Sequence, residues 1–284
     1  MLDSRTTLYG LIGLPLKHSL SPQIHNYIFK HSKINSIYLC FEVNSSNLRE
    51  AIKGAVSLGF RGFNVTIPYK EEVIPYLDSI DKEASIIGAV NTIKIWRDKT
   101  YGFNTDGIGF ISSLKKHNFI CQNKNILILG AGGAAKSISV YLAKAKVNKI
   151  IYYDIIYEKA KELALHIRKF FPSLETNVIR DKDKISLKDV GLLINATGVG
   201  LHKKDPLVIE LKDFEKNLVV YDLIYNPLST PLIKDAQKKR LRTINGLWML
   251  IYQAIKAQEI WHDKRIEINE NIIYNLLVKK LKND

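Results

Sequence analysis

Two short stretches hold the side chains best suited to chemistry. They are Phe63–Lys70 (FNVTIPYK) and Asn104–Gly107 (NTDG). Each places small polar side chains among hydrophobic neighbours, as in the wall of a binding site. Together they offer one amine, that of Lys70, and one carboxylate, that of Asp106. We expect these two groups to form a proton-transfer pair, with the amine lying across a cleft from the carboxylate.

A glycine-rich turn lies further along, at Gly130–Ala135 (GAGGAA). Gly130 permits a tight turn, Gly132 lets backbone N–H groups approach a pyrophosphate, and Ala135 is small enough for close helix–strand packing. An apolar strand precedes the turn and an Ala-rich helix follows it, as the dinucleotide fingerprint requires. The alternative is a purely structural turn. The residues expected to contact a dinucleotide here are Gly130, Ala131, Gly132, Gly133 and Ala134. A proton-transfer pair together with a dinucleotide indicates hydride chemistry.

Asp154 ends the next predicted strand, 24 residues after Gly130. An acid at this position usually accepts hydrogen bonds from the adenosine ribose, and it would repel a ribose 2′-phosphate. The residues that follow, 155–158, include no cation. We therefore expect NAD or NADP, with NAD favoured. The alternative is that Asp154 only caps the helix that begins near Tyr157. A later stretch of small residues, Asn195–Gly200, ends another strand and leaves room for the nicotinamide half of the cofactor.

Composition limits the remaining possibilities. The 284 residues, 46% of them hydrophobic, are enough for two domains with real cores. No apolar run approaches the roughly 18 residues of a membrane helix, and residues 1–10 lack a signal pattern. The only cysteines, Cys40 and Cys121, are far apart. They argue against a disulfide framework or a zinc cluster and favour the reducing cytoplasm. We expect no metal and no membrane partner.

The net charge of +14 allows two interpretations. One is a polyanionic partner such as nucleic acid. The other is a set of solvated helix faces, because the lysines alternate with apolar residues at helical spacing. No nucleic-acid motif accompanies them, so we expect no nucleic-acid partner. A positive field would still attract an anionic substrate or a dinucleotide.

Strands and helices alternate along the chain, which predicts an α/β fold with mainly parallel sheets. In the first half we expect strands at 8–13, 36–43 and 63–67. We expect three helices there: one with Ser21 as its N-cap, one at 48–58, and one from Pro68 to about residue 77. In the second half we expect strands at 126–129, 149–153, 190–195 and 218–222, and helices at 134–146, 157–170 and 247–262. A helix near 106–117 would connect the two domains.

At this point the chain resembles the shikimate dehydrogenase family over nearly its whole length, from Tyr9 to about Trp261. Eight motifs occur in the family's order. They are His18–Pro22, Asn64–Lys70, Gly88–Thr92, Asn104–Gly107, Gly130–Ala135, Asn195–Gly200, Asp222–Pro227 with Thr230–Leu232, and Gly246–Leu250 with Gln253.

The resemblance implies reversible reduction of 3-dehydroshikimate to shikimate, in the shikimate pathway to chorismate and the aromatic amino acids. It implies a substrate-binding domain of residues 1–106 and 243–284. It also implies a Rossmann-like dinucleotide-binding domain of residues 107–242, with a C-terminal helix packing back on the first domain. A small-molecule substrate is the expected partner, and the protein is expected to be a monomer or a homodimer.

The same resemblance assigns roles to individual residues. Lys70 and Asp106 would be the catalytic pair. Ser19 and Ser21 would bind the substrate carboxylate. The ring and its hydroxyls would be held by Asn64, Thr66, Asn91, Tyr225 and Gln253. The cofactor would also contact Asn195, Ala196, Thr197, Gly246 and Met249 in addition to the glycine-rich turn and Asp154.

The residues support parts of this assignment independently. Asn64 and Thr66 alternate with apolar residues, so both point to one face of their strand; the alternative is an edge strand that faces water. A helix beginning at Pro68 would lower the pKa of Lys70, and Asp106 would oppose that effect. His25 has no partner at metal-ligand spacing and suits a packing role.

The chain departs from the family pattern at two places. Trp248 stands where the family usually has a small residue, either narrowing the nicotinamide pocket or filling the core. Asp154-Ile155-Ile156 replaces the Asn-Arg-Thr of NADP-dependent members. The second departure favours an NAD-dependent quinate/shikimate dehydrogenase acting oxidatively, whereas serine at both carboxylate-binding positions favours shikimate. A non-catalytic dinucleotide-binding regulator is the alternative from another class, and the intact Lys70 and Asp106 argue against it.

Overall fold

The computed structural model describes residues 2–202 and 204–283, so the two ends of the predicted first domain, Met1 and Asp284, lie outside it. The chain divides into two compact units. The first contains Met1–Gly109 and Ile251–Asp284, and the second contains Phe110–Leu250. The sequence-based division placed the two domain boundaries after residues 106 and 242, whereas the compact units change after Gly109 and Leu250.

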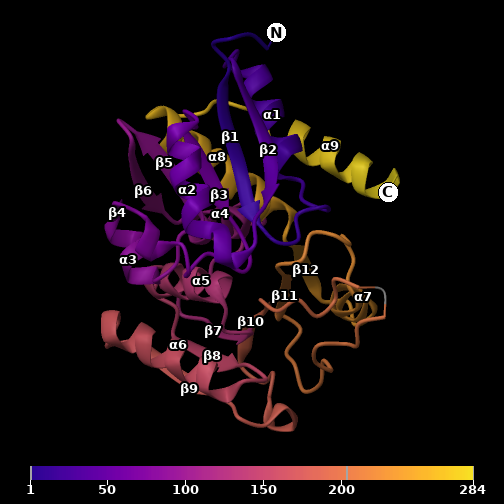
Figure 1. The fold of residues 1–284 in the computed structure, drawn as a ribbon. Helices are drawn as coiled ribbons and strands as arrows, with labels where there is room; N and C mark the ends of the chain where they lie inside the picture. Colours follow the sequence, from indigo (N-terminus) through magenta and orange to yellow (C-terminus); the bar gives the residue numbers. More distant parts are fainter. Residues whose placement is uncertain (1, 203, 284) are drawn as a thin grey trace. The chain divides into compact units, whose positions relative to one another are not determined.

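The first unit contains a six-stranded sheet in the order β2-β1-β3-β5-β6-β4 (Figure 1). Its strands are β1 (Thr7–Gly13), β2 (Ser36–Glu42), β3 (Gly62–Val65), β4 (Ser79–Ile80), β5 (Thr92–Trp96) and β6 (Lys99–Phe103). Strands β2, β1 and β3 run parallel, β5 is antiparallel to β3 and β6, and β4 is parallel to β6. The sheet core includes Ile12, Phe63, Val65 and Ile93.

The helices of the first unit are α1 (Ser21–His31), α2 (Leu48–Ser57), α3 (Lys82–Ile87) and α9 (Glu270–Asn283), with short 3-10 turns η1 (Ser45–Asn47) and η2 (Ile74–Tyr76). The C-terminal helix α9 contacts α1. Helices α4 (Asp106–Lys116) and α8 (Leu247–His262) each contain a boundary between the units.

The second unit has an all-parallel sheet in the order β12-β11-β10-β7-β8-β9. Its strands are β7 (Asn125–Leu129), β8 (Lys149–Tyr153), β9 (Glu175–Val178), β10 (Val190–Asn195), β11 (Val219–Asp222) and β12 (Arg242–Asn245). Its helices are α5 (Gly133–Lys144), α6 (Tyr157–Phe170) and α7 (Pro231–Lys238), and η3 (Lys182–Lys184) is a 3-10 turn. Strand order reverses between β7 and β10, and doubly wound sheets bind ligands outside the carboxyl ends at such a point.

The predicted fold class is confirmed: both units are α/β with mainly parallel sheets, and the C-terminal helix packs on the first unit. Several elements match their predicted ranges, including β8, β10, α6 and α8. The antiparallel hairpin β5–β6, strands β4, β9 and β12, and helices α3 and α7 were not predicted, and the bounds of α9 were not predicted either.

Two local predictions are wrong. No α-helix begins at Pro68: the chain passes through turns to η2, because the Lys70 carbonyl accepts a hydrogen bond from Val90 N at 2.7 Å and the Ile74 N–H donates to Glu71 instead. Ser21 is not an N-cap. It is the first residue of α1, Leu20 occupies the N-cap, and the Ser21 N–H donates to Ser19 Oγ at 3.2 Å.

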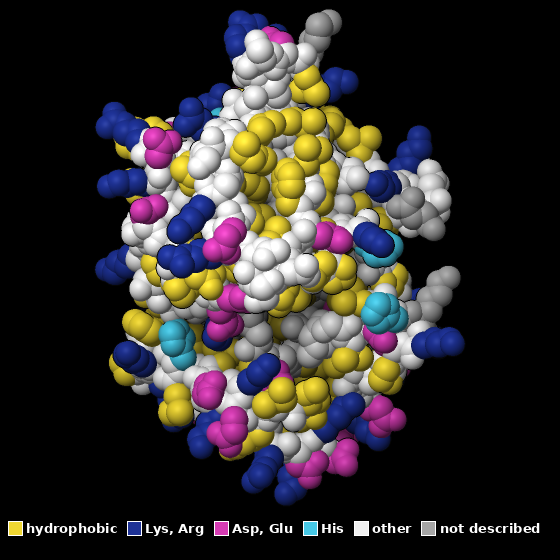
Figure 2. Space-filling model, viewed as in Figure 1, with side chains coloured by type: hydrophobic (Ala, Val, Ile, Leu, Met, Phe, Trp, Pro, Cys, Tyr) yellow, Lys and Arg dark blue, Asp and Glu magenta, His cyan; other side chains and the backbone are white. Residues whose placement is uncertain are grey.

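No helix among the described residues combines the length and apolarity needed to cross a membrane. On the face seen in Figure 2, Lys and Arg side chains are interspersed with Asp and Glu side chains. That face has the mixed charge of an ordinary solvated surface.

Candidate active site

One edge of the first unit's sheet gathers most of the polar residues predicted for catalysis. Strand β3 ends at Val65, and β5 begins at Thr92. The two strands are antiparallel and Asn64 pairs with Thr92, so the end of β3 lies beside the start of β5. Thr92 in turn pairs with Phe103, the last residue of β6. The segments that follow β3, precede β5 and follow β6 therefore meet at the same edge. Asn64, Asn91, Thr105 and Asp106 lie there and are buried.

Lys70 and Asp106 form a direct ion pair at this edge. Lys70 Nζ lies 2.5 Å from Asp106 Oδ2, and the two side chains are 16% and 8% exposed. The two groups are in direct contact within the first unit, so the expectation that the amine lies across a cleft from the carboxylate is wrong. Removal of both groups from water strengthens their interaction and orients the amine.

Asn91 holds the carboxylate of this pair. Its amide Nδ2 donates to Asp106 Oδ1 at 2.8 Å and to Thr105 Oγ1 at 3.0 Å. Its Oδ1 accepts from Thr105 N at 2.8 Å and from Thr92 Oγ1 at 2.9 Å. Asp106 N donates to Asn104 Oδ1 at 3.0 Å, which fixes the backbone at the start of α4. Asp106 therefore has little freedom to change rotamer.

Asn64 extends this network to β2. Its Nδ2 donates to Thr92 Oγ1 at 3.0 Å and to the Asn91 carbonyl at 3.1 Å, and its Oδ1 accepts from the Tyr38 hydroxyl at 2.9 Å. Tyr38 is fully buried, and burial raises the pKa of its hydroxyl well above the usual value. The hydroxyl therefore stays protonated and remains a donor to Asn64. The result is a continuous polar chain from Tyr38 to Lys70.

His25 packs against this chain from α1. Its ring stacks on that of Tyr38 with centroids 4.2 Å apart, and its Nδ1 lies 2.9 Å from Gln258 Nε2. Burial lowers the pKa of His25 to about 3, so the ring is neutral at ordinary pH. A neutral, stacked imidazole has the packing role predicted for His25.

The remaining predicted substrate residues lie in several places. Ser19 and Ser21 lie at the start of α1, Ser21 buried and Ser19 partly buried. Thr66 directly follows β3 and is partly buried. Gln253 lies on α8 in the first unit, with its Oε1 3.4 Å from Thr105 Oγ1. Tyr225 follows β11 and belongs to the second unit.

Four residues of the polar network were not predicted to act in the site: Tyr38, Thr92, Asn104 and Thr105. Thr105 is fully buried and links Asn91 to Gln253. Its position in the NTDG motif was a usable signal. Tyr38 gave no such signal in the sequence, because a buried tyrosine in a strand usually only fills the hydrophobic core.

The glycine-rich turn of the second unit has the shape required for a dinucleotide. Gly130 adopts φ +99°, and a Cβ there would lie 2.9 Å from the Ala196 carbonyl oxygen. A Cβ on Gly132 would meet no atom within 4 Å, so this glycine borders open space. Gly132 is the N-cap of α5 and provides no capping side chain. Because the first N–H groups of an α-helix have no intrahelical acceptor, those of α5 at Gly133 and Ala134 are suited to a pyrophosphate.

Asp154 is held by backbone donors. Its Oδ2 accepts from Ala131 N at 2.8 Å, and its Oδ1 accepts from Ile156 N at 2.9 Å. The carboxylate thus ties the glycine-rich turn to the residues before α6. It does not cap α6, whose N-cap is Ile156, so that alternative is wrong.

Asn195 is fully buried, and its side chain forms hydrogen bonds with other residues of the second unit. Its amide donates to Asp222 Oδ1 at 3.0 Å and to the Val199 carbonyl at 3.1 Å. Its Oδ1 accepts from Thr197 Oγ1 at 2.7 Å. Asn195 therefore shapes the loop that carries Ala196 and Thr197 beside Gly130.

The junction between β12 and α8 is tightly packed. A Cβ on Gly246 would lie 1.9 Å from the Leu223 carbonyl oxygen, which only a glycine permits. Met249 is 7% exposed and Trp248 is 8% exposed. The Lys116 ammonium lies 4.6 Å from the centroid of the Trp248 ring. In the second unit, Trp248 is thus a largely buried side chain with a cation over its face.

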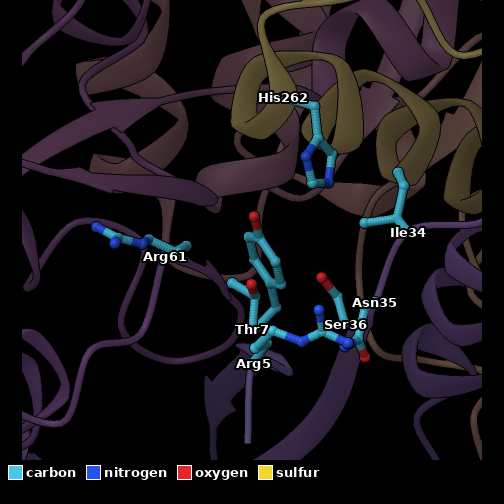
Figure 3. A pocket seen from close by; sticks show the side chains of 8 residues that line it. Arg5, Thr7, Ile34, Asn35, Ser36, Arg61 and His262 are labelled. Carbon is cyan, nitrogen blue, oxygen red and sulfur yellow. The ribbon is translucent and has the colours of Figure 1, made fainter. Parts of the chain in front are cut away.

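A separate cavity of about 550 Å³ lies elsewhere in the first unit (Figure 3). It is bordered by Thr7 and Ser36, the first residues of β1 and β2, and by Arg61, which precedes β3. These are the amino ends of the parallel strands. Lys70 and Asp106 follow the carboxyl ends of their strands, β3 and β6, so they lie at the other edge of the sheet. Figure 3 shows His262 directed into the cavity and the Arg61 guanidinium directed away from its centre. The cavity is not part of the catalytic arrangement.

Comparison with known proteins gives consistent matches. The family model described as the shikimate dehydrogenase substrate binding domain matches residues 11–93. A shikimate dehydrogenase (NADP(+)) of Methanocaldococcus jannaschii is 43% identical over 288 residues, which cover 98% of this chain and 100% of that protein.

Solved structures agree with this relative. A crystal structure of a shikimate dehydrogenase in complex with NADP+ superposes with a TM-score of 0.92 at 42% identity, covering 99% of this chain and 98% of that chain. A shikimate 5-dehydrogenase of Listeria monocytogenes, in complex with shikimate and NAD, gives a TM-score of 0.88 at 31% identity, covering 97% of this chain and 98% of that chain.

Proposed function

Because the chain belongs to the shikimate dehydrogenase family, we propose that it reversibly reduces 3-dehydroshikimate to shikimate, with Lys70 and Asp106 as its acid–base pair. The observation that carries this proposal is the buried Lys70–Asp106 ion pair at 2.5 Å, held by Asn91. It supplies a cation and a carboxylate at fixed positions where an alkoxide would form.

The nicotinamide cofactor, when bound, supplies the hydride. Reduction of a ketone leaves an oxyanion, and the Lys70 ammonium stabilises that charge and delivers a proton to it. Asp106 Oδ2 accepts from Lys70 Nζ and keeps the amine directed. In the oxidative direction the same pair receives the proton from the substrate hydroxyl.

Substrate contacts divide into two groups by the hydrogen bonds that the residues already make. Asn64 and Asn91 both donate their amide hydrogens to protein acceptors, so we propose that they mainly position the pair. Asn64 Oδ1 accepts from the Tyr38 hydroxyl and retains a lone pair for a substrate hydroxyl, whereas both lone pairs of Asn91 Oδ1 are used by Thr105 N and Thr92 Oγ1. Ser19 and Ser21, at the start of α1, remain the proposed ligands of the carboxylate. Thr66, Tyr225 and Gln253 remain the proposed ligands of the ring hydroxyls.

For the cofactor we propose that the second unit binds NADP through the glycine-rich turn, the loop 195–197 and the residues at Gly246 and Met249. The relatives named NADP(+)-dependent support this, and the sequence-based preference for NAD has no support from those relatives. The two cysteines, both free in the described chain, favour a reducing compartment, and we propose the cytoplasm.

The test is an assay of reduced-nicotinamide absorbance in which shikimate and quinate are each offered with NADP and with NAD. We expect the fastest rate with shikimate and NADP. A faster rate with quinate would support the quinate dehydrogenase alternative. Cofactor binding without turnover of either substrate would support the non-catalytic regulator.

A further inference from the structure

The motif Asp222–Pro227 begins with a carboxylate that the proposed chemistry does not use. Asp222 ends β11, is fully buried, and forms no ion pair with any described residue. Its Oδ1 accepts from Asn195 Nδ2 at 3.0 Å and from Ile224 N at 3.1 Å, and its Oδ2 accepts from Thr230 Oγ1 at 2.7 Å. Burial raises the pKa of this carboxyl above its usual value, although the three hydrogen bonds favour its charged form. The donors come from separate segments, so this one side chain ties those segments together.

Asp222 closes the loop that contains Tyr225. At the start of this loop the Ile224 N–H donates to Oδ1, and at its end the Thr230 hydroxyl donates to Oδ2. Thr230 is also the N-cap of α7, where its Oγ1 accepts a backbone N–H of the first turn. The two oxygens of one carboxylate therefore fix both ends of residues 223–230, and with them the backbone from which Tyr225 extends.

The same carboxylate reaches the neighbouring strand. Asn195, which ends β10 in register with Asp222, donates to this carboxylate and also to the Val199 carbonyl at 3.1 Å. A second bond joins the same two strand ends, from Leu223 N to the Asn195 carbonyl at 3.0 Å. The loop that follows β10 and the loop that follows β11 are therefore joined at one buried point.

We propose that Asp222 is a positioning residue that holds Tyr225 for the substrate and the loop 195–197 for the cofactor. This inference rests on the proposed function, in which Tyr225 binds a ring hydroxyl and that loop contacts NADP. Because Asp222 is fully buried, it acts only through the hydrogen bonds that fix the two loops. Its loss therefore impairs the binding of both ligands, while the Lys70–Asp106 pair of the first unit stays in place.

Steady-state kinetics of Asp222→Asn test this role, because the variant keeps the side-chain size and replaces one acceptor oxygen by a donor amide. We expect KM for shikimate and KM for NADP each to rise by roughly tenfold, and kcat to fall by less than about threefold. Asp78→Asn is the matched control. Asp78 also accepts two hydrogen bonds, from Thr100 N at 2.8 Å and Thr100 Oγ1 at 2.7 Å, but in the first unit. Asp78→Asn should leave both KM values unchanged, and wild-type KM values in Asp222→Asn would overturn the proposal.

Two variants of Thr230 separate the two loops. Thr230→Val removes the hydroxyl that closes the Tyr225 loop but keeps the bond from Asn195 to Asp222. KM for shikimate should therefore rise by roughly fivefold, and KM for NADP should change by less than about twofold. Thr230→Ser keeps the hydroxyl and should restore the wild-type KM for shikimate. Equal rises of both KM values in Thr230→Val would contradict the division between the loops.

A double-mutant cycle shows whether Asp222 acts on the substrate through Tyr225. Tyr225→Phe alone should raise KM for shikimate. Adding Asp222→Asn should raise it by less than about threefold more, because the position of a missing hydroxyl no longer matters. Effects that multiply would show that Asp222 acts by another route. A wild-type KM for shikimate in Tyr225→Phe would refute Tyr225 as a substrate ligand, and with it the substrate half of this proposal, without affecting the catalytic pair.

Discussion

At the scale of single residues, the site is a chain of hydrogen bonds in which few atoms remain free. Asn91 uses its amide hydrogens on Asp106 and Thr105, and Asn64 uses its own on the Asn91 carbonyl and Thr92. Only Lys70, at one end, combines a charge with partial exposure. This end of the network is where proton transfer is possible.

Replacement of Lys70 by alanine tests that role. We expect Lys70→Ala to reduce kcat by about 10²–10⁴-fold, because the proton donor is lost, while shikimate still binds. Steady-state kinetics with a separate substrate-binding titration would measure both effects. Lys53→Ala, an exposed lysine on α2, is the control and should behave as wild type. Near-normal turnover in Lys70→Ala would remove Lys70 from the chemistry.

The candidate catalytic residues were found in the sequence because they belong to short motifs, but their arrangement was not. Lys70 and Asp106 are 36 positions apart, and their contact depends on the antiparallel placement of β5 between β3 and β6. The turn that makes this hairpin uses Arg97 and Asp98 at φ +49° and +58°, which is unusual for residues other than glycine or asparagine. Without that turn signal, the hairpin and the contact it creates were not predictable.

At the scale of elements, the segment after Pro68 shows how tertiary contacts override local preference. Its proline and spacing resemble a helix start, yet a helix would need the Lys70 carbonyl for Ile74 N. That carbonyl instead accepts from Val90 N, and buried Tyr69 donates its hydroxyl to the Val43 carbonyl. Helix α7 shows the reverse case. The Thr230 side chain caps this helix by accepting a hydrogen bond from Ile233 N, and Pro231 is the first helical residue. The sequence therefore contained a recognisable helix start here, although the helix was not predicted.

Two glycines assigned to the cofactor site should behave differently when substituted. Gly246→Ala places a methyl group against the Leu223 carbonyl and should lower the unfolding free energy by at least about 2 kcal/mol. Gly132→Ala meets no atom within 4 Å and should leave stability unchanged. It should instead weaken NADP roughly fivefold by obstructing one N–H contact. Urea unfolding and a binding titration of both variants would separate the two roles. Equal stability of the two variants would contradict this distinction.

At the scale of the whole molecule, a buried neutral histidine makes stability depend on pH. The folded pKa of His25 is about 3, against 6.5 when the chain is unfolded, so the unfolded chain binds more protons below pH 6.5. The contribution of His25 is fully present above pH 6.5 and is lost as the pH falls from there toward 3. At pH 5 the loss is about 2 kcal/mol.

Urea unfolding at a series of pH values between neutral and acidic would measure this dependence. We expect His25→Gln to be less stable than wild type at neutral pH and to have a shallower acid dependence. His31→Gln, an exposed histidine at the end of α1, should retain the wild-type dependence. An unchanged slope in His25→Gln would show that other groups control acid sensitivity.

The division of the chain into units also has a consequence for its synthesis. The second unit is one continuous segment, Phe110–Leu250, inserted between the two segments of the first unit. On the ribosome, the second unit is therefore fully translated while the first still lacks Ile251–Asp284, including Gln258 beside His25 and Trp261 beside Tyr9. Until those residues emerge, the nascent first unit exposes apolar surface, so a chaperone or ribosome pause acting late in translation would affect that unit and not the inserted one.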